Sequence, residues 1–289
     1  MTAGWGARVR LRIEQFAPAL GRVDANLTHV VRAQADAAAE GVGLLVTPEL
    51  SMTGYDVRDA VHALAAAESD APYPTMLPGP DVVLGTIERD AAFVPYNAAL
   101  HLRGGRVLHR HRKVYLPTYG MFDEGRWFGR GDGVRAYDAG GGWRVGLLVC
   151  EDLWHPALSW LLAAQGANLL VVQSAAAGRG VVAGGASGGR FASWGAWEHL
   201  ARAAAIAYGA YVALANRVGV EGPLCFAGGS MIVAPDGNVV ARADDLNPDR
   251  IDAELSLEAV AAARRPYAHA RDDDPRLVAR ELARMLGEG

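Results

Sequence analysis

The chain has 289 residues, of which 51% are hydrophobic and 21% are charged, and its formal net charge at pH 7 is −4. This composition supports a sizeable core and argues against nucleic acid or an anionic membrane as partners, because both bind through excess positive charge. No apolar run approaches the roughly 20 residues that a membrane helix needs, and two cysteines are too few for a disulfide framework.

The first fifty residues have the pattern of a strand, a helix and a second strand. Residues 8–16 alternate apolar and polar side chains, residues 21–41 repeat apolar residues at helical spacing, and residues 42–50 form an apolar run ending near Glu49. The opening "MTAGWGARVRLRIEQF" lacks the apolar region of a signal peptide, which favours a cytoplasmic location. We therefore predict a β–α–β unit with a loop at the carboxyl end of its second strand.

The next elements are read from the same patterns. We predict a helix at 59–68, strands at 81–89, 95–103 and 106–114, and a polar loop at 115–133. Further strands are predicted at 144–152, 168–176, 210–219, 228–243 (as a hairpin) and 249–257, helices at 155–167, 192–209 and from residue 258, and a glycine-rich loop at 178–189. Strands alternate with helices without a linker or repeat, so we predict one α/β domain over 1–289, with a core at about 7–262 and a tail at 263–289.

Three reactive side chains, Glu49, Lys113 and Cys150, each lie just past a predicted strand. Loops at the carboxyl ends of strands converge on one rim of an α/β sheet. A thiol with its usual pKa of roughly 8.5 is mostly protonated at neutral pH, so a carboxylate that takes the proton and an ammonium that holds negative charge would activate it. The Lys113 ammonium and the backbone N–H of Glu151 are candidate donors to an oxyanion.

Each of these residues also has a simpler interpretation. A lone cysteine after an apolar strand is more often a buried small hydrophobe. An isolated glutamate at a strand end usually caps a helix or lies on the surface, and the basic run His109–Lys113 is typical of a solvated edge. Spacing alone therefore leaves the catalytic interpretation open.

The segments around the three residues resemble the carbon–nitrogen hydrolase, or nitrilase, superfamily. They read "PELSMTGYD" around Glu49, "HRKVYLPTYGMFDEGRWF" around Lys113 and "LLVCEDLWHP" around Cys150. Later segments, "ANRVGVE", "FAGGSMIVAPDGNVV" and "RRPYAHARDDDP", are similar to the closing strands and tail of that family. The resemblance implies a four-layer αββα sandwich and a Glu–Lys–Cys triad.

The resemblance also implies the role of each residue. Glu49 is expected as general base, Cys150 as nucleophile, Lys113 as oxyanion stabiliser and Glu124 as the glutamate that orients substrate and lysine. The reaction is acyl transfer through a thioester, and it requires no metal or organic cofactor. The histidine pattern agrees, because no His/Cys cluster has convincing zinc spacing.

The lysine and cysteine loops are most similar to the glutamine-amidase domain of glutamine-dependent NAD synthetases. In that group the pocket is built around the residues that match Tyr55, Tyr119, Phe122 and Glu151. We add two further residues to the predicted substrate-binding set, which are Trp154 and Ser174. The signature loop of the synthetase half, Ser-Gly-Gly-x-Asp-Ser, is absent, because "SGGRFAS" lacks the aspartate.

The glycine-rich stretch departs from a glutamine pocket, and its arginines, Arg179 and Arg190, are candidates for contact with a substrate carboxylate or are simply solvated. We expect a free-standing amidase of a small linear amide, ω-amide or N-carbamoyl compound. The alternatives are a glutaminase-type subunit that supplies ammonia to a separate NAD synthetase-like partner, and a true nitrilase. The family usually dimerises, so we expect a homodimer or higher homo-oligomer with the tail at the interface.

Overall fold

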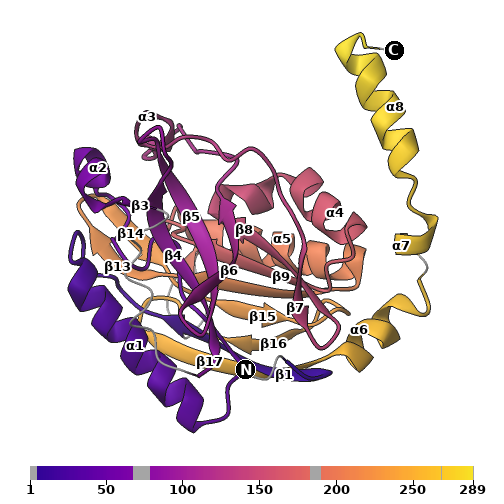
Figure 1. Cartoon of the computed structure of the whole chain (residues 1–289), viewed down its shortest axis with the longest axis horizontal. Coiled ribbons are helices and arrows are strands. Elements are labelled where there is room, and N and C mark those ends of the chain that lie inside the picture. The colour runs from indigo at the N-terminus through magenta and orange to yellow at the C-terminus, as the bar shows by residue number, and fades with distance from the viewer. Residues whose placement is uncertain (1–4, 68–78, 183–189, 268, 289) are drawn as a thin grey trace.

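A computed structural model describes residues 5–67, 79–182, 190–267 and 269–288. Two β-sheets face each other, and helices cover their outer faces (Figure 1). This arrangement is the expected α/β sandwich with layers in the order αββα. Within the described ranges, no helix combines the length and the apolar character needed to cross a membrane.

The first sheet has seven strands, in the order β17-β1-β2-β4-β5-β6, with β3 paired to β4. Its strands are β1 (Arg8–Gln15), β2 (Leu44–Val46), β3 (Ala66–Ala67), β4 (Asp81–Arg89), β5 (Pro95–Arg103), β6 (Arg106–Arg112) and β17 (Asp249–Ser256). The helices beside it are α1 (Val23–Ala39), a 3₁₀ turn η1 (Arg58–Ala60) and α2 (Val61–Leu64). Strands β1, β2 and β4 run parallel, so their carboxyl ends lie at one edge of the sheet.

The second sheet has six strands in the order β16-β15-β12-β9-β8-β7. They are β7 (Tyr137–Gly140), β8 (Trp143–Val149), β9 (Leu169–Ser174), β12 (Tyr211–Asn216), β15 (Met231–Val233) and β16 (Val239–Arg242). Two short ribbons pair β10 (Val181–Val182) with β11 (Arg190–Phe191) and β13 (Val218–Glu221) with β14 (Leu224–Ala227). The helical segments are α3 (Glu124–Trp127), η3 (Cys150–Trp154), α4 (Pro156–Ala164), α5 (Ala192–Tyr208), α6 (Leu257–Arg264), α7 (His269–Asp272) and α8 (Pro275–Leu286).

The alternation of side chains along the strands divides the core into layers. In β2, Leu44 and Val46 join the large cluster between the two sheets, whereas Leu45 packs in the cluster that contains Val30 and Ala33 of α1. Successive side chains of a strand point to opposite faces, and both faces of this sheet are covered. This is why the sequence shows continuous apolar runs in β2.

Several elements differ from the sequence prediction. The helix expected at 59–68 ends at Leu64, because Ala65 is extended and leads into β3, which pairs with β4. The loop expected at 115–133 contains α3. The strand expected to reach residue 152 ends at Val149, because Cys150 has a φ of 49° and begins a 3₁₀ turn. The strand expected at 210–219 is divided between β12 and β13, and strands β7 and β14 were not predicted. The glycine-rich loop falls partly on 183–189, which lie outside the described residues.

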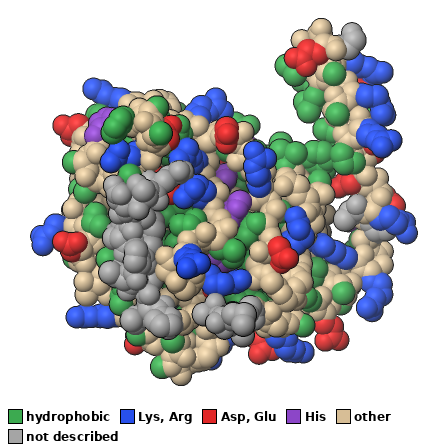
Figure 2. Space-filling view, in the orientation of Figure 1, with side chains coloured by type: hydrophobic (Ala, Val, Ile, Leu, Met, Phe, Trp, Pro, Cys, Tyr) green, Lys and Arg blue, Asp and Glu red, His purple; other side chains and the backbone are tan. Residues whose placement is uncertain are grey.

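The predicted tail contains α8, which stands away from the sandwich (Figure 1). Asp274 caps this helix by accepting hydrogen bonds from the backbone N–H groups of Arg276 and Leu277. Its apolar side chains are exposed, including Met285 at 82% and Leu286 at 69%, and Figure 2 shows them on the side of α8 that faces the body. The homo-oligomer stays a prediction, and light scattering that gives a monomer mass would contradict it.

The loop that carries Glu49, residues 47–54, is docked directly on Gly85 of β4. The Gly85 carbonyl accepts hydrogen bonds from Met52 N at 3.0 Å and Ser51 Oγ at 3.1 Å, and its N–H donates to Ser51 Oγ at 3.1 Å. A Cβ at Gly85 would lie 2.4 Å from Pro48 O and 2.6 Å from Leu50 N. Only glycine allows this close approach.

We therefore expect Gly85→Ala to push the 47–54 loop off β4 and to lower the free energy of unfolding by about 1–3 kcal/mol or more, because overpacked backbone contacts are costly. The matched control is Gly195→Ala in α5, where an added Cβ has open space and should be neutral or stabilising by up to about 1 kcal/mol. Urea unfolding measures both. A Gly85→Ala protein as stable as the parent would contradict the prediction.

Candidate active site

A buried lysine lies between two buried glutamates at the carboxyl ends of the strands. The Lys113 Nζ donates to Glu49 Oε1 at 2.7 Å and to Glu124 Oε1 at 2.7 Å. None of the three side chains is more than 4% exposed. Burying one ammonium requires paired, hydrogen-bonded counter-charges, and here two carboxylates supply them. The structure thus brings together three of the four residues that the sequence singled out for catalysis.

The carboxylate of Glu49 is held at both oxygens. Asn97 Nδ2 donates to its Oε1 at 2.7 Å, and the backbone N–H of Ala175 donates to its Oε2 at 2.7 Å. Asn97 is a residue that the sequence analysis missed. Its signal was a lone amide inside the apolar strand "PYNAALHLR", where a buried polar side chain needs a partner.

Cys150 lies in the turn directly after β8, and it is 6% exposed. Its φ of 49° is in the left-handed region, which a side chain makes unfavourable. Ser174, at the end of the neighbouring strand β9, donates from Oγ to the Cys150 Sγ at 3.6 Å. The predicted nucleophile and the predicted binding residue Ser174 therefore lie side by side.

Asp152 ties the cysteine turn to the lysine segment. Its Oδ1 accepts from the backbone N–H groups of Val114 at 3.0 Å and Tyr115 at 2.9 Å. Its Oδ2 accepts from the N–H of Val149 at 3.1 Å and bonds to His111 Nε2 at 2.8 Å. The sequence analysis did not single out Asp152, because most of its partners, at 111–115, are distant in sequence.

The electrostatics keep the thiol protonated at rest. Burial, and next the charge of Glu49, raise the pKa of Cys150 well above its ordinary value, although Lys113 opposes this. Burial alone would lower the pKa of Lys113, but the charges of Glu124 and Glu49 raise it well above its ordinary value. Burial raises the pKa of Glu124 to about 7, with Lys113 acting against the shift. The sulfur therefore needs a base at the moment of attack.

Aromatic side chains and one acid form a connected group beside this cluster. The Tyr55 hydroxyl donates to Glu124 Oε1 at 2.5 Å, and the Tyr119 hydroxyl donates to Glu151 Oε2 at 2.9 Å. Phe122 lies edge-on to both tyrosine rings, at 6.0 and 6.1 Å between centroids. Partial burial and the Glu151 contact raise the pKa of Tyr119 to about 12, so it stays a donor. Four predicted binding residues thus form one group.

Arg179 and Trp154, which the sequence also singled out, differ in whether they contact this aromatic group. The Arg179 guanidinium lies over the rings of Tyr119, at 5.6 Å, and Phe122, at 5.1 Å, and it forms no ion pair with a described residue. Trp154 is 40% exposed and packs edge-on against Trp197 of α5 at 5.5 Å. In the part of the chain that the structure describes, Trp154 makes no ring contact with the aromatic group. The side chain of Arg190 lies outside the described residues.

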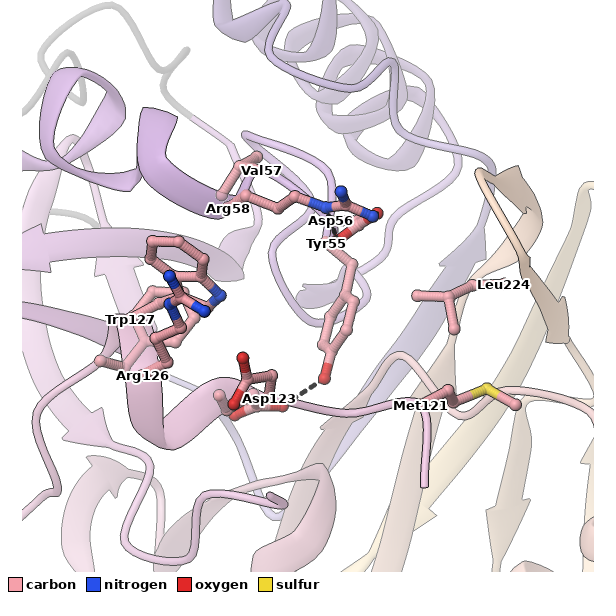
Figure 3. Close-up of a pocket in the computed structure, with 11 residues that line it drawn as sticks. Tyr55, Asp56, Val57, Arg58, Met121, Asp123, Arg126, Trp127 and Leu224 are labelled. Carbon is pink, nitrogen blue, oxygen red and sulfur yellow. Dashed lines mark hydrogen bonds and ion pairs between the residues drawn. The ribbon is translucent and has the colours of Figure 1, made fainter. Parts of the chain in front are cut away.

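A cavity of about 260 Å³ adjoins Glu124, and its lining includes Arg58 of η1 and Arg126 and Trp127 of α3. Figure 3 shows the Tyr55 ring reaching from the 47–58 segment to α3, with Arg126 and Trp127 beyond it. The Glu124 Oε2 atom is buried and receives no hydrogen bond from a described residue. Among the described residues there is no cluster of three His, Cys, Asp or Glu side chains that could hold a metal ion.

Comparison with known proteins identifies the family of this chain. A family model described as carbon-nitrogen hydrolase matches residues 10–265. The chain therefore belongs to the carbon–nitrogen hydrolase family, as its three motifs predicted. Glutamine-dependent NAD(+) synthetases from Thermotoga maritima and Rhodobacter capsulatus are each 31% identical, over 87% and 81% of this chain. The aligned part is 42% and 41% of those proteins, so this chain spans less than half the length of these relatives.

Solved structures extend the likeness to proteins that this chain matches over nearly their whole length. The amidase from Nesterenkonia sp. AN1, in a double mutant with acrylamide bound, has a TM-score of 0.77 and 26% identity, and the match covers 96% of this chain and 98% of that one. A carbon–nitrogen hydrolase from Helicobacter pylori G27 has a TM-score of 0.79 at 24% identity, covering 92% and 95%. These likenesses confirm the predicted sandwich fold.

The raised pKa of Glu124 leads to a testable dependence of stability on pH. Its folded pKa of about 7 is above the ordinary 4.5, so the native state binds more protons between these values. The contribution of Glu124 to the free energy of unfolding is fully present below about pH 4.5 and is lost as the pH rises through 7. We expect the unfolding free energy of Glu124→Gln, relative to the parent, to rise by on the order of a few kcal/mol from pH 5 to pH 8.

Urea unfolding of both proteins at the two pH values measures this difference. Glutamine keeps the acceptor for Lys113 and Tyr55 but cannot ionise, so it serves as a close mimic of the protonated carboxyl group. Parallel pH profiles for the two proteins would show that Glu124 does not titrate in this range.

Proposed function

We propose that this chain is a cysteine-dependent amidase that cleaves the C–N bond of a small linear amide, ω-amide or N-carbamoyl compound. The observation that carries the proposal is the buried Lys113 ammonium held between Glu49 and Glu124, within electrostatic range of the Cys150 thiol. An ion pair that only stabilises the fold needs neither a second carboxylate nor a strained cysteine beside it. Acyl transfer, in contrast, uses a nucleophilic thiol, a carboxylate that moves the proton, and an ammonium that stabilises the oxyanion and is itself held in place.

In the first half of the reaction, Glu49 removes the thiol proton while Cys150 Sγ bonds to the substrate carbonyl carbon. Glu49 Oε2 has one described donor, Ala175 N, and so retains acceptor capacity for that proton. The Lys113 ammonium and the backbone N–H of Glu151 donate to the oxyanion. When the carbonyl re-forms, the C–N bond breaks, and Glu49 gives its proton to the departing nitrogen.

In the second half, a water molecule gives a proton to Glu49 and its oxygen attacks the thioester carbonyl. The C–S bond then breaks, and the sulfur takes the proton back, so the carboxylic acid leaves and the enzyme is regenerated. The second glutamate, Glu124, keeps the ammonium of Lys113 fixed in both halves through the 2.7 Å hydrogen bond. No metal or organic cofactor takes part in this sequence.

The surroundings of the thiol support a substrate with an anionic group away from the amide. Arg179 offers a guanidinium beside Tyr119 and Phe122, and its charge acts on the Tyr119 hydroxyl against that of Glu151. A guanidinium in this place pairs favourably with a carboxylate. Amides that carry a carboxylate are therefore proposed as better substrates than neutral ones.

A second candidate function is a glutaminase-type subunit that supplies ammonia to a separate synthetase partner. It is favoured by the curated relatives, which are named glutamine-dependent NAD(+) synthetases and match this chain over about two fifths of their length. An activity assay with and without a synthetase partner distinguishes the two functions. A free amidase turns over substrate alone, whereas a subunit stays slow on glutamine until its partner is added.

The central prediction concerns the nucleophile. We expect Cys150→Ala to reduce turnover by at least about 10³-fold, because no other group in the site can form the thioester. Cys225→Ala is the matched control, since it removes the other free thiol and should retain full activity. Ammonia release from glutamine, asparagine, N-carbamoyl compounds, other ω-amides and nitriles is the assay.

Intact-mass spectrometry during turnover should also detect a substrate-sized adduct that Cys150→Ala lacks. Substantial hydrolysis by Cys150→Ala would refute the mechanism. Turnover of nitriles in preference to amides would identify a nitrilase, and activity on glutamine only with an added synthetase would identify the ammonia-supplying subunit.

A further inference from the structure

A second buried ion pair lies where β12 leads into β13, in the segment "ANRVGVE". Arg217 follows the last residue of β12, Glu221 ends β13, and the Nη1 of Arg217 donates to the Oε1 of Glu221. The two side chains are only 1% and 4% exposed. A buried ion pair is costly to desolvate, and apolar residues of similar volume often stabilise a fold equally well. This pair therefore suggests a role besides stability.

The second oxygen of Glu221 holds the backbone from which the Tyr55 side chain extends. Its Oε2 accepts hydrogen bonds from the backbone N–H groups of Tyr55 at 3.0 Å and Asp56 at 2.8 Å. Gly54 allows this close approach, because its φ is +77° and an added Cβ would lie 2.9 Å from Glu221 Oε1. One carboxylate thus fixes two successive peptide groups of a loop that is distant in sequence.

The same ion pair also supports the Tyr55 ring from the side. The Arg217 guanidinium lies over the ring of Phe226, 4.0 Å from its centroid. Phe226 is buried, and it packs edge-on against the Tyr55 ring at 5.8 Å between centroids. Figure 3 shows the Tyr55 ring reaching toward α3, where its hydroxyl donates to Glu124. The ring is therefore held both at its backbone and along one edge.

We propose that Glu221, with Arg217 as its counter-charge, is a positioning residue that holds the Tyr55 hydroxyl on Glu124. The Glu124 Oε1 atom accepts from this hydroxyl at 2.5 Å and from the Lys113 ammonium at 2.7 Å. The hydroxyl therefore helps to fix the carboxylate that holds the lysine. For turnover, this inference rests on the proposed function, in which Glu124 keeps Lys113 in place.

Two double variants that both lack the ion pair test this inference. Arg217→Met/Glu221→Gln keeps an acceptor oxygen for the two N–H groups, whereas Arg217→Met/Glu221→Met has a side chain of similar length whose sulfur accepts only weakly. Because both charges are removed together, no unpaired buried ion remains to unfold either protein. The two variants differ in the hydrogen bonds that they offer to Tyr55 and Asp56.

Tyr55→Phe is then added to the parent and to each double variant, and urea unfolding gives the change in the unfolding equilibrium constant. We expect an increase of at least about tenfold in the parent and in the Glu221→Gln protein, because a hydrogen bond to a carboxylate is lost. We expect less than about threefold in the Glu221→Met protein, where the hydroxyl is no longer held on Glu124.

Leu255→Ala is the control for loss of stability alone. Leu255 is buried on β17, the edge strand of the first sheet, and its truncation lowers stability without touching the Tyr55 loop. Tyr55→Phe should have its full effect in this background, because distant sites are additive. Equal effects of Tyr55→Phe on unfolding in the Glu221→Gln and Glu221→Met proteins would overturn the positioning role.

Amide hydrolysis measures the consequence for the proposed reaction. Tyr55→Phe should lower the kcat of the parent by about tenfold or more. The Glu221→Met protein should already show this loss, with less than about threefold added by Tyr55→Phe, and the Glu221→Gln protein should recover at least about fivefold of it. A full further loss on adding Tyr55→Phe to the Glu221→Met protein would contradict the inference.

The two kinds of measurement separate this inference from the proposed function. If the parent hydrolyses no amide, the proposed function is refuted, and the unfolding measurements still decide whether Glu221 positions Tyr55. If the parent is active and the unfolding effects of Tyr55→Phe are equal in both double variants, the positioning role alone is refuted.

Discussion

The structure depends on one charge, the ammonium of Lys113, which is removed from water and held between two carboxylates. A buried ion is stable only where its partners are fixed in good geometry, so the surrounding elements have to hold Glu49 and Glu124 still. Asn97 and the backbone of Ala175 fix the first carboxylate, and the Tyr55 hydroxyl fixes the second. The cluster therefore links the first sheet, the second sheet and the α3 segment through short, directional contacts.

The segments that carry these groups are joined in pairs. Gly85 allows the 47–54 loop to rest on the backbone of β4, and Asp152 joins the end of β6 to the end of β8. Neither Gly85 nor Asp152 needs to touch a substrate, because each acts by fixing the position of these segments. In an enzyme, a misplacement of about 1 Å in a catalytic group can lower the rate on the order of a hundredfold.

The sequence predicted the elements that carry strong periodicity or a motif. Strands β4 and β5, helix α5 and the grouping of Glu49, Lys113 and Glu124 follow from apolar runs and from the family resemblance. The extent of α2 was not predictable, since the pairing of β3 with β4 decides where it ends. Asn97 and Asp152 were missed for a related reason, because their roles come from hydrogen bonds to residues distant in sequence. The basic run of β6, which resembles a solvated edge in the sequence, acquires a cavity only when residues 132–135 pack beside it.

The backbone at Cys150 has a consequence for evolution of this chain. A non-glycine residue with a φ of 49° costs on the order of 1 kcal/mol, and most side chains other than those of Asn and Asp have a cost of this size or more at this position. Selection for stability alone would favour glycine there. Under the proposed function, a thiol is retained against that gradient only while turnover is under selection, so a lineage that lost the proposed reaction would be free to gain stability by replacing Cys150.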